Sequence, residues 1–122
     1  MKKNFKSITI LTSLCLFSFS TLHAEALSPA ELDQLVKEDI ATAQVLTEVC
    51  PSLVGHQDKI NHYVNEFTVN NLTRFSTPNL SLAQLQQDPQ YKVAYEEAKR
   101  DFLAADQNEQ KQGCSEITTL SQ

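Results

Sequence analysis

The sequence predicts an all-α fold, a small disulfide-stapled helical bundle of three main helices plus one short helix. Apolar residues recur at steps of three and four along most of the chain, as on the buried face of an amphipathic helix. Helix-capping residues stand where these repeats begin. No segment shows the sustained alternation or the Asn-Gly and Asp-Gly turns of β-hairpins. Together, these three observations predict the all-α class.

The first helix is expected to cover about 22 residues from Pro29 onward. Ser28 and Glu31 form a capping box, and Pro29 occupies the first helical position. Pro51 disfavours helical geometry in the residue before it, so we expect the helix to end at Cys50. Its apolar stripe comprises Leu32, Leu35, Val36, Ile40, Ala43, Leu46, Val49 and Cys50.

A second helix is expected after a turn at Gly55, with Asp58 as its N-terminal cap. Residues 68–71 have poor helix propensity, so we expect a bend or fraying there. Residues 76–81 are typical of a loop. The inward positions of this helix are Ile60, Tyr63, Val64, Phe67, Asn71 or Leu72, and Phe75.

A short helix is expected to begin at a second capping box, formed by Ser81 and Gln84, and to end near Gln87. Asp88 and Pro89 then combine a cap with a proline in the first turn.

The third long helix would therefore start at Pro89 and continue to Gly113, a typical C-terminal stop. Its residues beyond Ala105 include no apolar side chain before the glycine, so they are expected to project past the core. Cys114 follows at once, which places Cys50 and Cys114 at two helix C-termini.

The N-terminus predicts a secretory signal peptide: lysines in the first six residues, an apolar run from Ile8 to Phe19, then small residues. Cleavage is expected after Ala24, with Ala26 as the alternative, so that residues 1–24 leave and residues 25–122 form a single helical domain. An uncleaved anchor competes with this interpretation, but the apolar core of about 12 residues falls short of the roughly 20 that a spanning helix needs. We therefore expect a periplasmic protein without stable membrane insertion.

The net charge of the cleaved chain limits the classes of partner that it can be expected to bind. Without its three N-terminal lysines it would carry seven basic and fifteen acidic residues, a net charge of −8. Nucleic acids and anionic membrane surfaces attract clustered Lys and Arg instead. We expect no nucleic-acid partner.

Two cysteines, Cys50 and Cys114, would remain once Cys15 is removed with the signal peptide. In an oxidising compartment an even number of cysteines predicts a disulfide, with an intermolecular bond as the alternative. An intramolecular bond would close a loop of roughly 65 residues, which stabilises on the order of 4 kcal/mol in the chain-entropy model. The chain has no C-x-x-C motif of the kind that zinc or redox chemistry would use.

Two groups of residues are candidate sites. His62 and Glu66 lie four apart on a helix and are weak candidates for a metal site together with His56, although two ligands do not make a site and no metal is expected. The other group is the stripe of Tyr91, Tyr95 and Phe102, which forms either part of the core or a partner-binding face.

The sequence contains no nucleophile elbow and no phosphate-binding glycine loop. We therefore expect no enzyme activity and no cofactor. The remaining function class is a binding or interaction protein, whose partner would be another envelope protein.

The stretches EVCPSLVG and DPQYKVAYEEAKRDF, followed by Cys114, resemble a group of small exported two-cysteine helical proteins of Moraxella- and Acinetobacter-type bacteria. The resemblance implies an envelope location and supplies no activity. In size, acidity, helices and single disulfide the chain is also similar to acid-activated periplasmic chaperones of the HdeA type. An acid- or envelope-stress chaperone is therefore one alternative function, and a metal-handling protein using His62 and Glu66 is another.

Overall fold

The computed structural model describes residues 26–121, and within this range the regular secondary structure is helical, with loops and turns between the helices. The all-α class is confirmed. The expected signal peptide, residues 1–24, lies outside the described residues. The helices are α1 (Pro29–Val54), α2 (Gln57–Leu72), α3 (Leu82–Leu85), α4 (Pro89–Ala104) and α5 (Gln107–Leu120).

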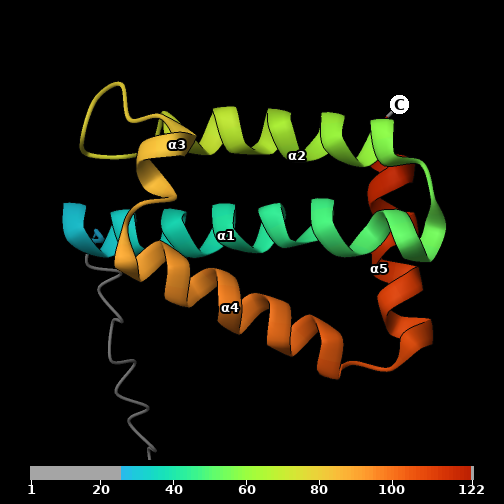
Figure 1. The fold of residues 1–122 in the computed structure, drawn as a ribbon. Coiled ribbons are helices and arrows are strands. Elements are labelled where there is room, and N and C mark those ends of the chain that lie inside the picture. Colours follow the sequence, from blue (N-terminus) through green and yellow to red (C-terminus); the bar gives the residue numbers. More distant parts are fainter. Residues whose placement is uncertain (1–25, 122) are drawn as a thin grey trace, which may run out of the picture.

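The longest helix, α1, lies between α2 and α4 and contacts both (Figure 1). The chain turns back after α1, so α2 runs antiparallel to it. After the loop and α3, α4 returns along the opposite side of α1. Finally, α5 crosses one end of this layer and packs on α1 and α2.

Three predicted helix starts are confirmed by their cap hydrogen bonds. The Ser28 and Glu31 box has both of its reciprocal bonds, with Ser28 N donating to Glu31 Oε2 at 2.8 Å. Ser81 Oγ accepts from Gln84 N at 3.1 Å. At the third start, Asp88 Oδ1 accepts from Gln90 N at 2.8 Å. These bonds satisfy backbone donors that a helix leaves unpaired in its first turn.

The expected end of α1 at Cys50 is wrong, because the helix continues through Pro51 to Val54. Proline lacks only one donor this close to the end of the helix, and its own carbonyl still accepts from Gly55 N at 3.0 Å. The added turn also packs Leu53 and Val54 against the core. Gly55, with φ of 68°, ends the helix as expected of a turn glycine.

Two expectations for α2 are also wrong. His56, not Asp58, stands at the N-cap, in the left-handed conformation and without a side-chain cap bond; Asp58 lies in the first turn. The helix then continues without a break to Leu72. Residues 68–71, which have poor helix propensity, are stabilised in the helix by contacts with α1. Thr68 is buried, and its Oγ1 accepts a hydrogen bond from Gln44 Nε2 at 3.0 Å. Tertiary contacts override propensity here.

The third long helix is in fact two helices. α4 ends at Ala104, Ala105 is extended, and Asp106 caps α5 by accepting from Asn108 N at 2.7 Å. The residues after Ala105 therefore do not project past the core. Cys114 lies inside α5, not at a helix end, and is fully buried, and Ile117 of the same helix is also buried. Bending the chain at Ala105 is what brings these side chains onto α1 and α2.

The predicted disulfide between Cys50 and Cys114 is present. It lies in one of two core clusters and joins α1 to α5, with Val49, Ile60, Val64 and Ile117 among its buried neighbours. The second cluster lies toward the other end of α1. Its buried members are Val36, Ile40, Ala41, Phe75, Leu85 and Tyr91.

Replacing Gly113 with alanine is expected to stabilise the protein. Gly113 lies inside α5, and a Cβ there would meet no atom within 4 Å. Since glycine is about 1 kcal/mol less favourable than alanine in a helix interior, Gly113→Ala should raise the free energy of unfolding by about 0.5–1 kcal/mol. Urea denaturation measures this. Gly55→Ala is the matched control and should destabilise, because φ at Gly55 is 68°. Destabilisation by Gly113→Ala would contradict the helical assignment.

Candidate functional site

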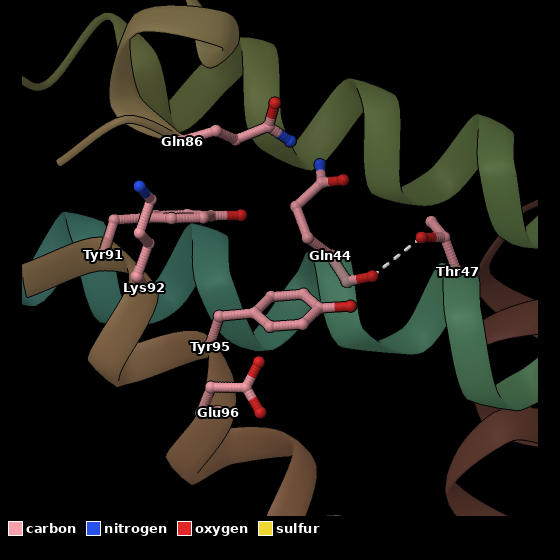
Figure 2. A pocket seen from close by; sticks show the side chains of 7 residues that line it. All are labelled: Gln44, Thr47, Gln86, Tyr91, Lys92, Tyr95 and Glu96. Carbon is pink, nitrogen blue, oxygen red and sulfur yellow. Dashed lines mark hydrogen bonds between the residues drawn. The ribbon is translucent and has the colours of Figure 1, made fainter. Parts of the chain in front are cut away.

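A polar groove of about 380 Å³ opens on α1 between α4 and the segment that contains α3 (Figure 2). This volume lies at the low end of the range of roughly 300–1,000 Å³ that is usual for ligand pockets. Its lining side chains come from three parts of the chain. They are Gln44 and Thr47 of α1, Gln86 just after α3, and Tyr91, Lys92, Tyr95 and Glu96 of α4.

The helical repeat explains how α4 contributes four of these residues. Tyr91 and Tyr95 are one turn apart and lie on the face that packs on α1, with ring centroids 6.4 Å apart. Lys92 and Glu96 follow each tyrosine by one position and are exposed at the outer edge of the groove. The groove therefore has a neutral inner end and one positive and one negative group at its rim.

The inner end contains a hydroxyl group without a partner. Tyr91 is only 4% exposed, and its ring belongs to the second core cluster. Its hydroxyl oxygen is the one buried side-chain polar atom in residues 26–121 that makes no hydrogen bond. Figure 2 shows it pointing into the space between Gln86 and Gln44. Burial raises the pKa of Tyr91, and a weak hydrogen-bonding contact with the Gln86 side chain opposes this shift in part, so the hydroxyl stays protonated.

Gln44 is positioned by a contact with the neighbouring helix. Its Nε2 donates to Thr68 Oγ1 of α2 at 3.0 Å, which leaves its Oε1 as an acceptor. Thr47 Oγ1 donates to the Gln44 backbone carbonyl at 2.7 Å, so Thr47 is also held against α1. Two of the groove's polar groups are thus oriented before any ligand arrives.

Tyr95 borders the groove through a charged network that joins α4 to α1. Its hydroxyl donates to Glu48, and Lys99 Nζ lies 2.6 Å from Glu48 Oε1. The hydrogen bonds from Lys99 and then Tyr95 lower the pKa of Glu48. Burial, followed by the bond to Glu48, raises the pKa of Tyr95. Unlike the hydroxyl of Tyr91, the hydroxyl of Tyr95 therefore already donates its one hydrogen bond.

Tyr91→Phe is expected to raise the free energy of unfolding by about 1 kcal/mol, because it removes a buried hydroxyl that no protein group satisfies. Thermal denaturation should show an increase in Tm of about 4–8 °C for a domain of this size. Tyr95→Phe is the matched control and should lower Tm, since it removes a donor to Glu48. Loss of stability in Tyr91→Phe would show that the hydroxyl has a partner in solution.

The structure separates the three aromatic residues that the sequence groups together. Tyr91 is buried, whereas Tyr95 is partly buried and packs against both clusters. Phe102 is also partly buried and packs against the disulfide cluster, outside the groove. The stripe thus covers the core along its length, and only its first two residues line the groove. Sequence reasoning missed the amides of Gln44 and Gln86, which resemble ordinary surface glutamines.

The weak metal candidates do not converge. His62 Nε2 and Glu66 Oε1 are 3.4 Å apart, and both side chains are more than half exposed. His56 is at the N-cap of α2, six positions before His62. Within residues 26–121 no three His, Cys, Asp or Glu side chains are grouped so that they could hold a metal ion. In the same range, none of the helices has the length and apolar character to cross a bilayer.

Fold and groove together define a small disulfide-bonded helical protein with a polar cleft on its central helix. Residues 36–117 match the family described as Domain of unknown function (DUF7944), and the chain belongs to this family. The matched segment begins and ends at buried residues, Val36 and Ile117, so it includes both core clusters and every groove residue. Comparison with curated proteins and with solved structures produced no match.

Proposed function

We propose that this chain is a non-enzymatic binding protein of the bacterial periplasm, whose groove receives part of another envelope protein. The observation that carries the proposal is the unpartnered hydroxyl of Tyr91 in the groove. A buried polar group without a partner costs about 1–3 kcal/mol, so a binding partner that supplies the missing hydrogen bond recovers that free energy. The oriented Gln44 beside it adds a second polar contact.

The proposed location rests on the order of residues at the N-terminus and on the disulfide. Lysines followed by a short apolar run and small residues are typical of a signal peptide. A buried disulfide between Cys50 and Cys114 suits an oxidising compartment. The resemblance to small exported two-cysteine proteins of Moraxella- and Acinetobacter-type bacteria supports the same location.

The chemistry of the groove supports binding over catalysis. Its inner groups are two amides, a threonine hydroxyl and two tyrosines. The pKa values of Tyr91 and Tyr95 are raised away from neutrality, whereas a general acid or base works best with a pKa near the operating pH. Neutral donors and acceptors of this kind hold a ligand.

Site-specific photo-cross-linking in the native envelope tests this function. A benzophenone amino acid would replace Gln86 or Lys92 at the groove, or Asn61 as a control, which is exposed on α2 and does not line the groove. We expect one exported protein to cross-link from both groove positions and not from Asn61. Once identified and purified, it should bind the chain directly. The same set of proteins at all three positions, or no direct binding, would contradict the proposal.

A specific set of contacts favours a second candidate, an acid-stress chaperone of the HdeA type. Carboxylates join α1 to the rest of the molecule at several places, and three of these contacts are short. Asp33 accepts from Ser76 N at 2.8 Å, Asp88 lies 2.8 Å from Lys37, and Glu48 binds Lys99 and Tyr95. Protonation of these groups would weaken the contacts of α1 with α4 and the loop, while the disulfide would still tie α1 to α5.

The same contacts predict that stability falls in acid. Hydrogen bonds from Ser76, Lys99 and Lys37 lower the pKa values of Asp33, Glu48 and Asp88, respectively, in the folded state. Their contribution is therefore complete above the unfolded pKa values, near pH 4, and is lost as the pH falls through the lowered folded values. Urea midpoints should be flat from pH 7 to about 5 and decrease below about pH 4.

The double variant Glu48→Gln/Asp88→Asn should be less stable at pH 7 and lose less stability on acidification. An unchanged acid slope would contradict the role of these carboxylates. The chaperone function itself requires that the chain suppress aggregation of a client protein at pH 2–3. Failure to suppress it would leave the groove-binding function as the sole proposal.

A further inference from the structure

The chemistry of the groove identifies the kind of group it binds. We propose that the groove receives an extended peptide segment of the partner, and that a peptide carbonyl accepts the hydrogen bond of the Tyr91 hydroxyl while the neighbouring N–H is donated to a glutamine oxygen. This inference rests on the proposed binding function and specifies its ligand. It is carried by the arrangement of Tyr91, Gln44 and Gln86 in Figure 2.

The ligand atom that meets Tyr91 is an acceptor without a full negative charge. The protonated hydroxyl offers a donor, and the pocket that surrounds it is neutral. A carboxylate would instead meet Glu96 as well as Lys92 at the rim, so the charged groups that line the groove offer it no net positive charge. The whole chain is acidic as well, with a net charge of −5. A carbonyl oxygen fulfils the requirement without this repulsion.

An amide ligand uses the glutamines better than an acceptor alone would. A glutamine side chain presents one carbonyl acceptor and one NH₂ donor in a plane, which complements the C=O and N–H of a peptide bond. Gln44 has its Nε2 engaged by Thr68, so its Oε1 is the atom that can accept from a peptide N–H. Gln86 is exposed, and its side chain has only a weak hydrogen-bonding contact, with the Tyr91 hydroxyl, so it can rotate to either role.

A sugar fits the same groove less well. Carbohydrate rings gain much of their affinity by stacking on an exposed aromatic face. Here the two tyrosine rings stack on each other with an interplanar angle of 29°, and Tyr91 is buried in the core. The groove also lies at the surface, with α4 on one side and Gln86 on the other, so an extended chain can reach its polar groups. These features favour a peptide.

The test is an NMR titration of the disulfide-bonded protein, expressed from its full sequence, with four probes. Acetyl-(Ser-Gly)₃-amide supplies neutral peptide groups, and acetyl-hexasarcosine-amide keeps the carbonyls but has no N–H along its backbone. Acetate supplies a carboxylate and cellotriose a sugar. The readout is the shift of the side-chain NH₂ signals of Gln44 and Gln86 and of the backbone amide of Tyr91.

We expect the Ser-Gly peptide to shift these signals and hexasarcosine to bind about tenfold more weakly, the usual effect of one lost hydrogen bond. Tyr91→Phe should weaken peptide binding by about tenfold while raising Tm, which separates the loss of binding from a loss of folding. Gln86→Ala should weaken binding too, and Gln112→Ala, an exposed control on α5, should not. Acetate and cellotriose should leave the groove signals unchanged.

Preferential binding of acetate or cellotriose, or peptide binding that Tyr91→Phe does not weaken, would overturn the peptide assignment. Its failure is distinguishable from failure of the binding function. If Tyr91→Phe abolishes binding of the cross-linked envelope protein although the Ser-Gly peptide does not bind, the ligand class is wrong and the groove remains the binding site. If neither the peptide nor an envelope protein engages the groove, both proposals fall.

Discussion

Removing the Cys50–Cys114 disulfide is expected to lower the free energy of unfolding by about 4 kcal/mol. The two cysteines are 64 positions apart, and both are fully buried. The crosslink restricts the unfolded chain, and in the chain-entropy account a loop of this length corresponds to about 4 kcal/mol. Because small domains have a total stability of about 5–15 kcal/mol, the loss would leave a marginally folded protein.

Urea denaturation of the Cys50→Ala/Cys114→Ala variant, compared with the oxidised wild type, measures this change. A reducing agent should destabilise the wild type and have no effect on the double variant, which separates the bond from side effects of the reagent. In hydrogen exchange, the amides of α5 should lose most protection, since the bond joins α5 to α1. A change below about 1 kcal/mol would contradict a stabilising role for the bond.

Leu85→Ala is expected to destabilise the protein by about 2–4 kcal/mol and to impair the groove. Leu85 is 1% exposed and anchors the four-residue helix α3 to the second core cluster. Truncation leaves a cavity in the cluster that contains Val36, Ile40 and Phe75. This cluster does not contain the disulfide. Gln86 follows Leu85 directly, so loss of this anchor should also weaken ligand binding at the groove.

Leu103→Ala is the matched control, because the same atoms are removed from a leucine that is 54% exposed. It should change the free energy of unfolding by less than about 1 kcal/mol. Urea denaturation gives both values, and the NMR titration with the Ser-Gly peptide gives the effect on binding. Similar losses for both variants would show that α3 is not anchored as described.

The two core clusters pack on different parts of α1. One end is tied to α5 by the disulfide and by Ile117. The other end is packed against Phe75, Leu85 and Tyr91. The groove residues of α1, Gln44 and Thr47, follow that end along the helix and alternate with members of the disulfide cluster. The unsatisfied hydroxyl of Tyr91 is consistent with a site where stability is reduced in favour of binding.

The sequence alone predicted the features that depend on neighbouring residues. The starts of α1, α3 and α4 follow from Ser28, Ser81 and Asp88, because each cap bond joins residues at most three positions apart. The all-α class follows from the spacing of apolar residues. The cysteine pairing was predictable because residues 26–121 contain only these two cysteines.

The break between α4 and α5 shows what local signals could not decide. Asp106 is a capable cap, and Gly113 is a capable stop, so the sequence allows the chain to bend at either one. The choice depends on Cys114 and Ile117, which become buried against α1 and α2 only when the chain turns before α5. In the same way, α1 continues through Pro51 because the added turn packs Leu53 and Val54 on the core.

The location of the groove could not be predicted from local sequence patterns, because the groove forms only in the tertiary structure. Gln44, Gln86 and Tyr91 come from three separate parts of the chain, and none of them has a local pattern that marks a site. Tyr91 was recognised from its helical spacing, but the lack of a partner for its hydroxyl appears only once α1 and α3 surround it. Local hydrogen bonds and apolar spacing therefore determined the helices, whereas the burial of side chains from distant segments decided where those helices end and where the candidate site lies.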